Sequence, residues 1–165
     1  MKMLIKNGMV FDGTGSPAVH TDLAVSGNRI ESTGTIEPSG FDRVIDAGGL
    51  AVCPGFIDTH SHSDLQLLLE PTVPPKLCQG ITTEILGQDG ISMAPLPTQY
   101  IDTWRKNLAG LNGETDAIDW CYETTAGYLN LLEEKGIGPN AGYLLPHGNV
   151  RMAIMGLDNR KASDE

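Results

Sequence analysis

The sequence predicts an α/β fold in two parts, in which a small sheet of short strands is followed by a parallel sheet with helices between its strands. Up to about residue 46 the chain consists of short apolar runs separated by Gly, Asn and Asp, which is typical of short paired strands. From about Leu50, strand, loop and helix patterns alternate, which is typical of βαβ units. We place the boundary between residues 52 and 53.

The first part, residues 1–52, is expected to be a small antiparallel sheet. A hairpin turn is predicted at Gly27-Asn28, because apolar strand patterns flank this dipeptide on both sides. The strands that we expect are Met3–Phe11, Asp22–Ser26, Arg29–Thr35 and Arg43–Asp46. A sheet of this size buries little apolar surface and is marginally stable by itself. We therefore expect another piece of chain to complete it.

The second part, residues 53–165, is expected to contain three parallel strands. The first is largely apolar over Leu50–Ile57, which indicates burial on both faces, and it runs on to His60. The other two are expected at Gly80–Leu86 and Ala141–Leu145. Amphipathic helices are expected at Thr98–Leu108 and Thr124–Lys135, the second of them ended by Gly136.

Parallel βαβ units of this kind build TIM-like (β/α)8 barrels, and a complete barrel takes about 250 residues. With 165 residues, the chain holds the first three βα units, and we expect the barrel to be incomplete. The last residues, Ser163-Asp164-Glu165, have the pattern of an N-cap followed by first-turn acids. This pattern predicts a helix start, and so a chain that is interrupted rather than finished.

Composition narrows the classes of partner. The net charge of −10 and the lack of a Lys/Arg cluster argue against nucleic acid and favour a small-molecule partner. Cys53, Cys78 and Cys121 are widely spaced, so neither a disulfide framework nor a cysteine zinc site is indicated. We see no signal-peptide core and no apolar run long enough to cross a bilayer. A cytoplasmic protein without a membrane partner is expected, and the sequence does not indicate its oligomeric state.

The strongest candidate for chemistry is the pair His60 and His62, at the end of the first predicted strand of the second part. Residues two apart on an extended strand point to the same face, so both imidazoles can reach one metal ion. Active sites of parallel barrels lie at this end of the strands. The alternative is a pair of packed histidines without a metal. We favour the metal, and expect zinc or another divalent ion.

Asp89 is the third candidate ligand, because it follows the second predicted strand in Gly87-Gln88-Asp89-Gly90. Its carboxylate could meet the metal there. The alternative is an ordinary Asp-Gly turn, which this dipeptide favours without any ligand. Glu84, inside the same strand, is expected to satisfy a local partner instead.

Further residues are expected around this pair. Asp58 shares the parity of the histidines, so we expect it to accept a ring N–H from one of them or to fix a neighbouring loop. Asp64 is expected to cap the next helix. His147 follows the third strand, where it could bind or polarise a substrate carbonyl, and Arg151 could hold a substrate carboxylate. The alternatives are a structural role for His147 and a surface salt bridge for Arg151.

Several motifs together resemble the N-terminal portion of an amidohydrolase-superfamily enzyme, and within it the D-aminoacylase (N-acyl-D-amino-acid deacylase) group. The motifs are Leu4–Gly8, Asp12–Gly15, Asp46–Gly49, Pro54–Asp64, Gln79–Glu84, Gly90–Leu96 and His147–Arg151. The resemblance implies a small β-sandwich built from both ends of a longer polypeptide. It also implies a metal-dependent barrel that hydrolyses the linear amide of an N-acyl-D-amino acid. His60 and His62 match the family's metal pair, and His147 matches a substrate-side histidine.

One departure from this family concerns Asp89, which stands where better-known deacylases have a metal-binding cysteine. A carboxylate is a harder ligand that can bridge two ions, so the identity and number of the metals stay open. The resemblance implies that later strands supply further histidines and a proton-shuttling aspartate. The chain alone is therefore expected to be inactive. The alternatives are a cyclic-amide hydrolase of the dihydroorotase or hydantoinase kind and a catalytically silent fragment.

Overall fold

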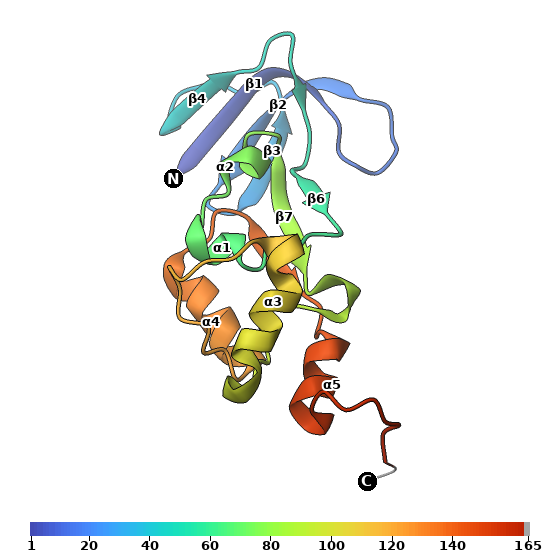
Figure 1. Cartoon of the computed structure of the whole chain (residues 1–165). Helices are drawn as coiled ribbons and strands as arrows, with labels where there is room; N and C mark the ends of the chain where they lie inside the picture. Colours follow the sequence, from blue (N-terminus) through green and yellow to red (C-terminus); the bar gives the residue numbers. More distant parts are fainter. Residues whose placement is uncertain (164–165) are drawn as a thin grey trace. The chain divides into compact units, whose positions relative to one another are not determined.

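The computed structural model describes residues 1–163, which divide into two compact units, residues 1–54 and residues 55 onward (Figure 1). The predicted helix start at Ser163 involves Asp164 and Glu165, which lie outside the described residues. The strands are β1 (Lys2–Val10), β2 (Val19–Ser26), β3 (Arg29–Gly34), β4 (Arg43–Asp46), β5 (Ala51–Val52), β6 (Phe56–Asp58), β7 (Ile81–Leu86) and β8 (Asn140–Tyr143). The helices are α1 (Gln66–Leu69), α2 (Pro74–Leu77), α3 (Ile101–Asn112), α4 (Thr125–Lys135) and α5 (His147–Met155), with 3-10 turns η1 (Gln88–Gly90) and η2 (Thr98–Tyr100).

The first unit is a five-stranded sheet in the order β3-β2-β1-β4, with β5 also paired to β1. The β2–β3 hairpin is as predicted, with Ser26 opposite Arg29 across the Gly27-Asn28 turn. The expectation of a wholly antiparallel sheet is wrong, because β4 and β5 both run parallel to β1. Asp22 explains part of the stability of this sheet. Its carboxylate is buried and accepts hydrogen bonds from the backbone N–H groups of Asn7 and Ile36.

The second unit contains a parallel sheet in the order β6-β7-β8. Helices α3 and α4 pack in its apolar core through Trp104, Leu108, Tyr128 and Leu132, all of them buried. The predicted helices agree with these two, since Thr124 caps the start of α4 and Gly136 ends it in a left-handed conformation. The mixed α/β character predicted from the sequence is therefore confirmed.

The continuous strand predicted from Leu50 is wrong in two respects. The chain forms β5 in the first sheet and β6 in the second, and Pro54 and Gly55 separate them. Proline has no N–H for a ladder, and a Cβ at Gly55 would overlap the side chain of Thr82. Burial on both faces is also contradicted, since Phe56 is 58% exposed and Ile57 is 60% exposed.

Two local predictions need correction as well. Asp64 does not cap a helix: α1 begins after Leu65 without a side-chain cap, and Asp64 is buried elsewhere. Helix α5 was not predicted, and it makes His147 the first residue of a helix rather than a strand end. Over residues 1–163, no helix combines the length and the apolar character needed to cross a membrane.

Candidate functional site

The two histidines of the H-x-H motif lie in the loop that follows β6, not on the strand itself. The prediction that strand parity aligns them is therefore wrong, yet the loop still brings both rings together. Their ring centroids are 5.3 Å apart and the ring planes meet at 65°. His60 Nε2 lies 3.2 Å from Asp89 Oδ2, and His62 Nε2 lies 3.1 Å from the same oxygen.

Asp89 reaches this position because it sits in a tight turn directly after β7. Its backbone is left-handed, with φ 56° and ψ 16°, a conformation that Asp tolerates better than most residues. Gly87 precedes it with φ 74°, and a Cβ at Gly87 would overlap the carbonyl oxygen of Leu144. Asp89 is thus in the turn that the alternative interpretation predicts, and this turn also points its carboxylate at the two imidazoles.

The three side chains form a donor set that fits a divalent cation. Their ligand atoms all lie within 4.8 Å of one another, and no other such group of His, Cys, Asp and Glu occurs among residues 1–163. In a tetrahedral zinc site with bonds of about 2.0–2.1 Å, neighbouring ligand atoms are about 3.3 Å apart. The two Nε2–Oδ2 separations are close to that value. Without a metal, the same distances correspond to two hydrogen bonds from the rings to one carboxylate oxygen.

Two buried side chains that the sequence analysis missed or misassigned fix the Asp89 turn. Gln88 donates its Nε2–H₂ to the carbonyl oxygens of Thr59 (2.8 Å) and Ile85 (3.0 Å), which ties the turn to the residue before His60. Asp64 Oδ1 accepts from Gly87 N (3.2 Å) and from the Ser92 hydroxyl, so it holds both ends of the turn. Burial raises the pKa of the Asp64 carboxyl, although the Ser92 hydrogen bond opposes this effect.

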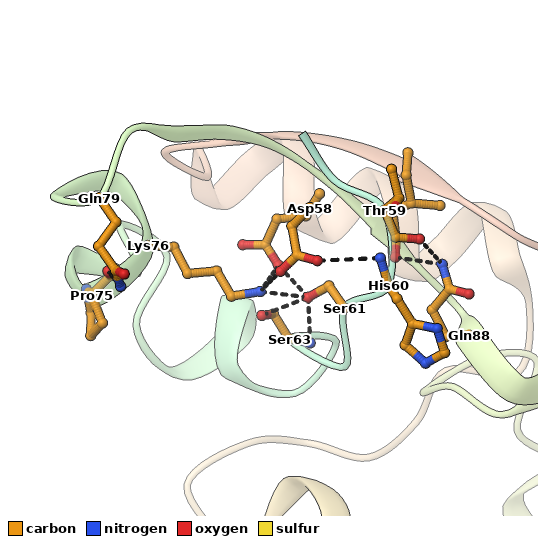
Figure 2. A network of polar contacts seen from close by, with 11 residues as sticks. Asp58, Thr59, His60, Ser61, Ser63, Pro75, Lys76, Gln79 and Gln88 are labelled. Carbon is orange, nitrogen blue, oxygen red and sulfur yellow. Dashed lines mark hydrogen bonds and ion pairs between the residues drawn. The ribbon is translucent and has the colours of Figure 1, made fainter. Parts of the chain in front are cut away.

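A second polar network lies behind the loop of the histidines (Figure 2). Lys76, from α2, donates from Nζ to Asp58 Oδ2 (2.9 Å), Ser61 Oγ (2.7 Å) and Glu84 Oε2 (2.7 Å). Ser61 also donates its hydroxyl to Glu84. The prediction that Glu84 satisfies a local partner is confirmed, since this fully buried carboxylate accepts hydrogen bonds from both Lys76 and Ser61.

Among residues 1–163, Asp58 accepts no ring N–H from a histidine, which corrects one of its two predicted roles. Its Oδ1 accepts the backbone N–H of His60 (3.2 Å), so it fixes the loop instead. The hydrogen bond from Lys76 lowers the pKa of the Asp58 carboxyl, against the opposing effect of partial burial. Burial disfavours the charge of Lys76, but its bonds to Asp58 and Glu84 outweigh this and raise the pKa of the ammonium.

His147 and Arg151 lie on α5, outside the group of three candidate ligands. The start of α5 touches the Asp89 turn, because a Cβ at Gly90 would be 3.7 Å from the backbone nitrogen of His147. His147 is exposed there. Arg151 forms no salt bridge in the described part of the chain; its guanidinium donates to the carbonyl oxygens of Asp158 (3.3 Å) and Arg160 (2.6 Å).

The chain is similar to curated and structurally characterised deacylases. D-aminoacylase of Alcaligenes xylosoxydans xylosoxydans is 34% identical over 163 residues, which are 99% of this chain and 32% of that protein. N-acyl-D-aspartate deacylase of the same organism is 38% identical over 161 residues, 98% of this chain and 31% of that protein. The chain thus spans about a third of the length of these curated relatives.

Solved structures agree with these relatives. A crystal structure of N-acyl-D-glutamate deacylase from Bordetella bronchiseptica, complexed with zinc and a phosphonate inhibitor, matches with a TM-score of 0.81 at 35% identity, over 93% of this chain and 31% of that one. A crystal structure of D-aminoacylase matches with a TM-score of 0.81 at 33% identity, over 98% of this chain and 33% of that one. A family model described as "Amidohydrolase family" covers residues 43–164. The chain belongs to the amidohydrolase family.

Proposed function

We propose that the chain is part of a metal-dependent hydrolase that cleaves the linear amide C–N bond of N-acyl-D-amino acids. The observation that carries this proposal is the convergence of His60, His62 and Asp89 at one edge of a parallel sheet. Relatives that are 34–38% identical to this chain are enzymes named for D-amino-acid deacylation.

Within this proposal, His60 and His62 bind zinc or another divalent ion through Nε2, and Asp89 binds it through Oδ2. Neutral imidazoles and a carboxylate are an established ligand combination for such ions. A bound divalent ion lowers the pKa of water and polarises a carbonyl group. The two polar networks described above hold these three ligand side chains in place, at the loop after β6 and the turn after β7.

His147 and Arg151 are proposed to contact the substrate. The carboxyl ends of β6, β7 and β8 lie at one edge of the parallel sheet, and His147 follows the last of these strands. An exposed imidazole beside the Asp89 turn can donate a hydrogen bond to an amide carbonyl. Arg151 is one turn further along α5, and a substrate carboxylate would compete there with the carbonyl oxygens that it now contacts.

We further propose that the second unit begins a TIM-like (β/α)8 barrel and that the first unit is part of a small β-sandwich. In support, β6, β7 and β8 pair in chain order and in parallel, as successive barrel strands do. The side chains of Phe56, Ile57 and Leu145 are apolar and exposed, as expected of a sheet against which further strands and helices of a barrel would pack. In the first unit, one face of the sheet carries an apolar hollow lined by Ile5, Leu23 and Val25.

The 165 residues alone are proposed to be inactive, because they correspond to about a third of each relative. The test uses the chain extended by any open reading frame downstream of Glu165. This extended protein is expected to release free D-amino acid from N-acetyl-D-amino acids and to lose that activity on treatment with a chelator. Ring opening of cyclic ureides without deacylation would overturn the proposed substrate class. Metal-dependent deacylation by the 165-residue chain would refute the proposal that these residues are inactive by themselves.

A further inference from the structure

Lys76 lies behind the loop that carries the two histidines. Figure 2 shows its ammonium group among Asp58 and Ser61, while the ring of His60 points away from it. Lys76 belongs to α2, which precedes β7 in the chain, and it forms none of the contacts of the ligand group. Its three contacts, at 2.7 to 2.9 Å, use all three donors of its ammonium group.

These contacts reach the backbone on both sides of the H-x-H motif. Asp58, which bonds to Lys76 through Oδ2, accepts the N–H of His60 through Oδ1. Ser61, which bonds to Lys76 through Oγ, accepts the N–H of Ser63 (3.2 Å) with the same oxygen. The side chains of residues 58 and 61 thus face Lys76, while those of residues 60 and 62 face Asp89. One ammonium group therefore fixes the loop segment that presents both imidazoles.

We propose that Lys76 is a positioning residue for the cation site: it holds the loop from Asp58 to Ser63 so that His60 and His62 present Nε2 together. This inference rests on the proposed metal site and deepens it. Lys76 touches neither the three ligand side chains nor, in this proposal, the substrate, and it acts only through Asp58, Ser61 and Glu84.

A role of Lys76 in holding the loop and a purely electrostatic role predict opposite effects of its replacement on cation affinity. Lys76 with the carboxylates of Asp58 and Glu84 forms a group with a net charge of −1 behind the site. Replacing Lys76 by Met would change this charge to −2, and Coulomb attraction alone would then tighten binding of a cation. If Lys76 acts by holding the loop, the same replacement weakens binding. The sign of the change therefore separates the two effects.

Folding has to be separated from positioning, because Glu84 is fully buried and its Oε1 has no hydrogen-bond partner among the described residues. Lys76→Met leaves this carboxylate without its cation, which destabilises a protein strongly. The double variant Lys76→Met/Glu84→Gln removes both opposite charges together. Ser61→Ala keeps every charge and removes one contact of the ammonium, together with the hydrogen bonds of the Ser61 hydroxyl to Glu84 and to the Ser63 N–H. The double variant leaves the total charge unchanged, and Lys106→Met, at an exposed position of α3, is the control for the change in total charge made by Lys76→Met.

The experiment titrates Co²⁺ into the purified 165-residue chain and its variants, follows the visible absorption bands of the bound ion, and then displaces Co²⁺ with Zn²⁺. Near-ultraviolet circular dichroism checks that each variant is folded. We expect both Lys76→Met and Lys76→Met/Glu84→Gln to bind Co²⁺ about 10- to 100-fold more weakly than the unmodified chain, with altered bands, as for other residues that support metal ligands. Ser61→Ala is expected to bind several-fold more weakly, and Lys106→Met like the unmodified chain.

Binding by the folded double variant and by Ser61→Ala that is as tight as that of the unmodified chain, or tighter, would overturn the role of Lys76 while leaving the metal site intact. Absence of Co²⁺ and Zn²⁺ binding by the unmodified chain would instead overturn the proposed metal site, and this inference with it. If the double variant does not fold, Ser61→Ala alone decides, because unchanged affinity and bands in that variant contradict the proposal.

Discussion

Replacing Gly87 by Ala tests how the Asp89 turn is built. An L-residue in the left-handed region costs about 1 kcal/mol relative to Gly, and Gly87 has φ 74°. The added Cβ would also overlap the carbonyl oxygen of Leu144 and lie 3.1 Å from its carbon, so β7 and the segment after β8 would have to separate. Moving Gly87 also strains its hydrogen bond to the buried Asp64, which is worth about 1–3 kcal/mol. We expect Gly87→Ala to lower the free energy of unfolding by about 3 kcal/mol in total.

Gly136→Ala is the matched control, because Gly136 is also left-handed, with φ 69°, but a Cβ there meets nothing within 4 Å. It reports the conformational cost alone, about 1 kcal/mol. Urea unfolding followed by tryptophan fluorescence gives the free energy of unfolding of both variants. Equal losses in Gly87→Ala and Gly136→Ala would refute the close approach of Gly87 to Leu144.

Three other expectations concern the ligand pair, the Asp89 turn and the core. His60→Ala combined with His62→Ala should abolish zinc retention in the extended protein, and unchanged zinc by elemental analysis would favour packed histidines without a metal. Gln88→Ala should lower the free energy of unfolding by about 2 kcal/mol, because it removes two hydrogen bonds to carbonyl oxygens, although the Ile85 oxygen keeps the N–H of Ser61; a loss below 0.5 kcal/mol, a threshold of about half one typical hydrogen bond, would contradict the bonds described. Burial raises the pKa of Tyr128 above its ordinary value of 10.0. The buried neutral side chain therefore contributes fully to the free energy of unfolding below about pH 10, and this contribution declines as the pH rises further. Tyr128→Phe should remove this part of the alkaline decline, measured by urea unfolding at a series of pH values, and an identical decline in both proteins would contradict it.

The grouping of His60, His62 and Asp89 could be predicted because each of these candidate ligands follows a strand with a clear pattern. His60 and His62 come after an apolar run, and Asp89 comes after the β-branched run of β7, so parallel pairing brings them to one edge. What the sequence did not show was how they converge. The pair lies in a loop, where parity does not apply, and Asp89 depends on a left-handed turn.

The supporting residues were missed because their partners are distant in the chain. Lys76 is on a four-residue helix with no amphipathic pattern, and it reaches a carboxylate eight residues away and another eighteen away. Asp64 has the local pattern of a helix cap, but burial beside Ser92 gives it a different role. Only the three-dimensional arrangement distinguishes such contacts from surface charge or capping.

Strands β6 and β8 each have a hydrogen-bonded neighbour on one side only within residues 1–163. Their outer backbone N–H and C=O groups are thus available to pair with another polypeptide. Purified samples of the 165-residue chain should therefore self-associate, and their apparent mass in size-exclusion chromatography should grow with protein concentration. Work with this polypeptide therefore calls for dilute samples, and for light scattering alongside every binding measurement.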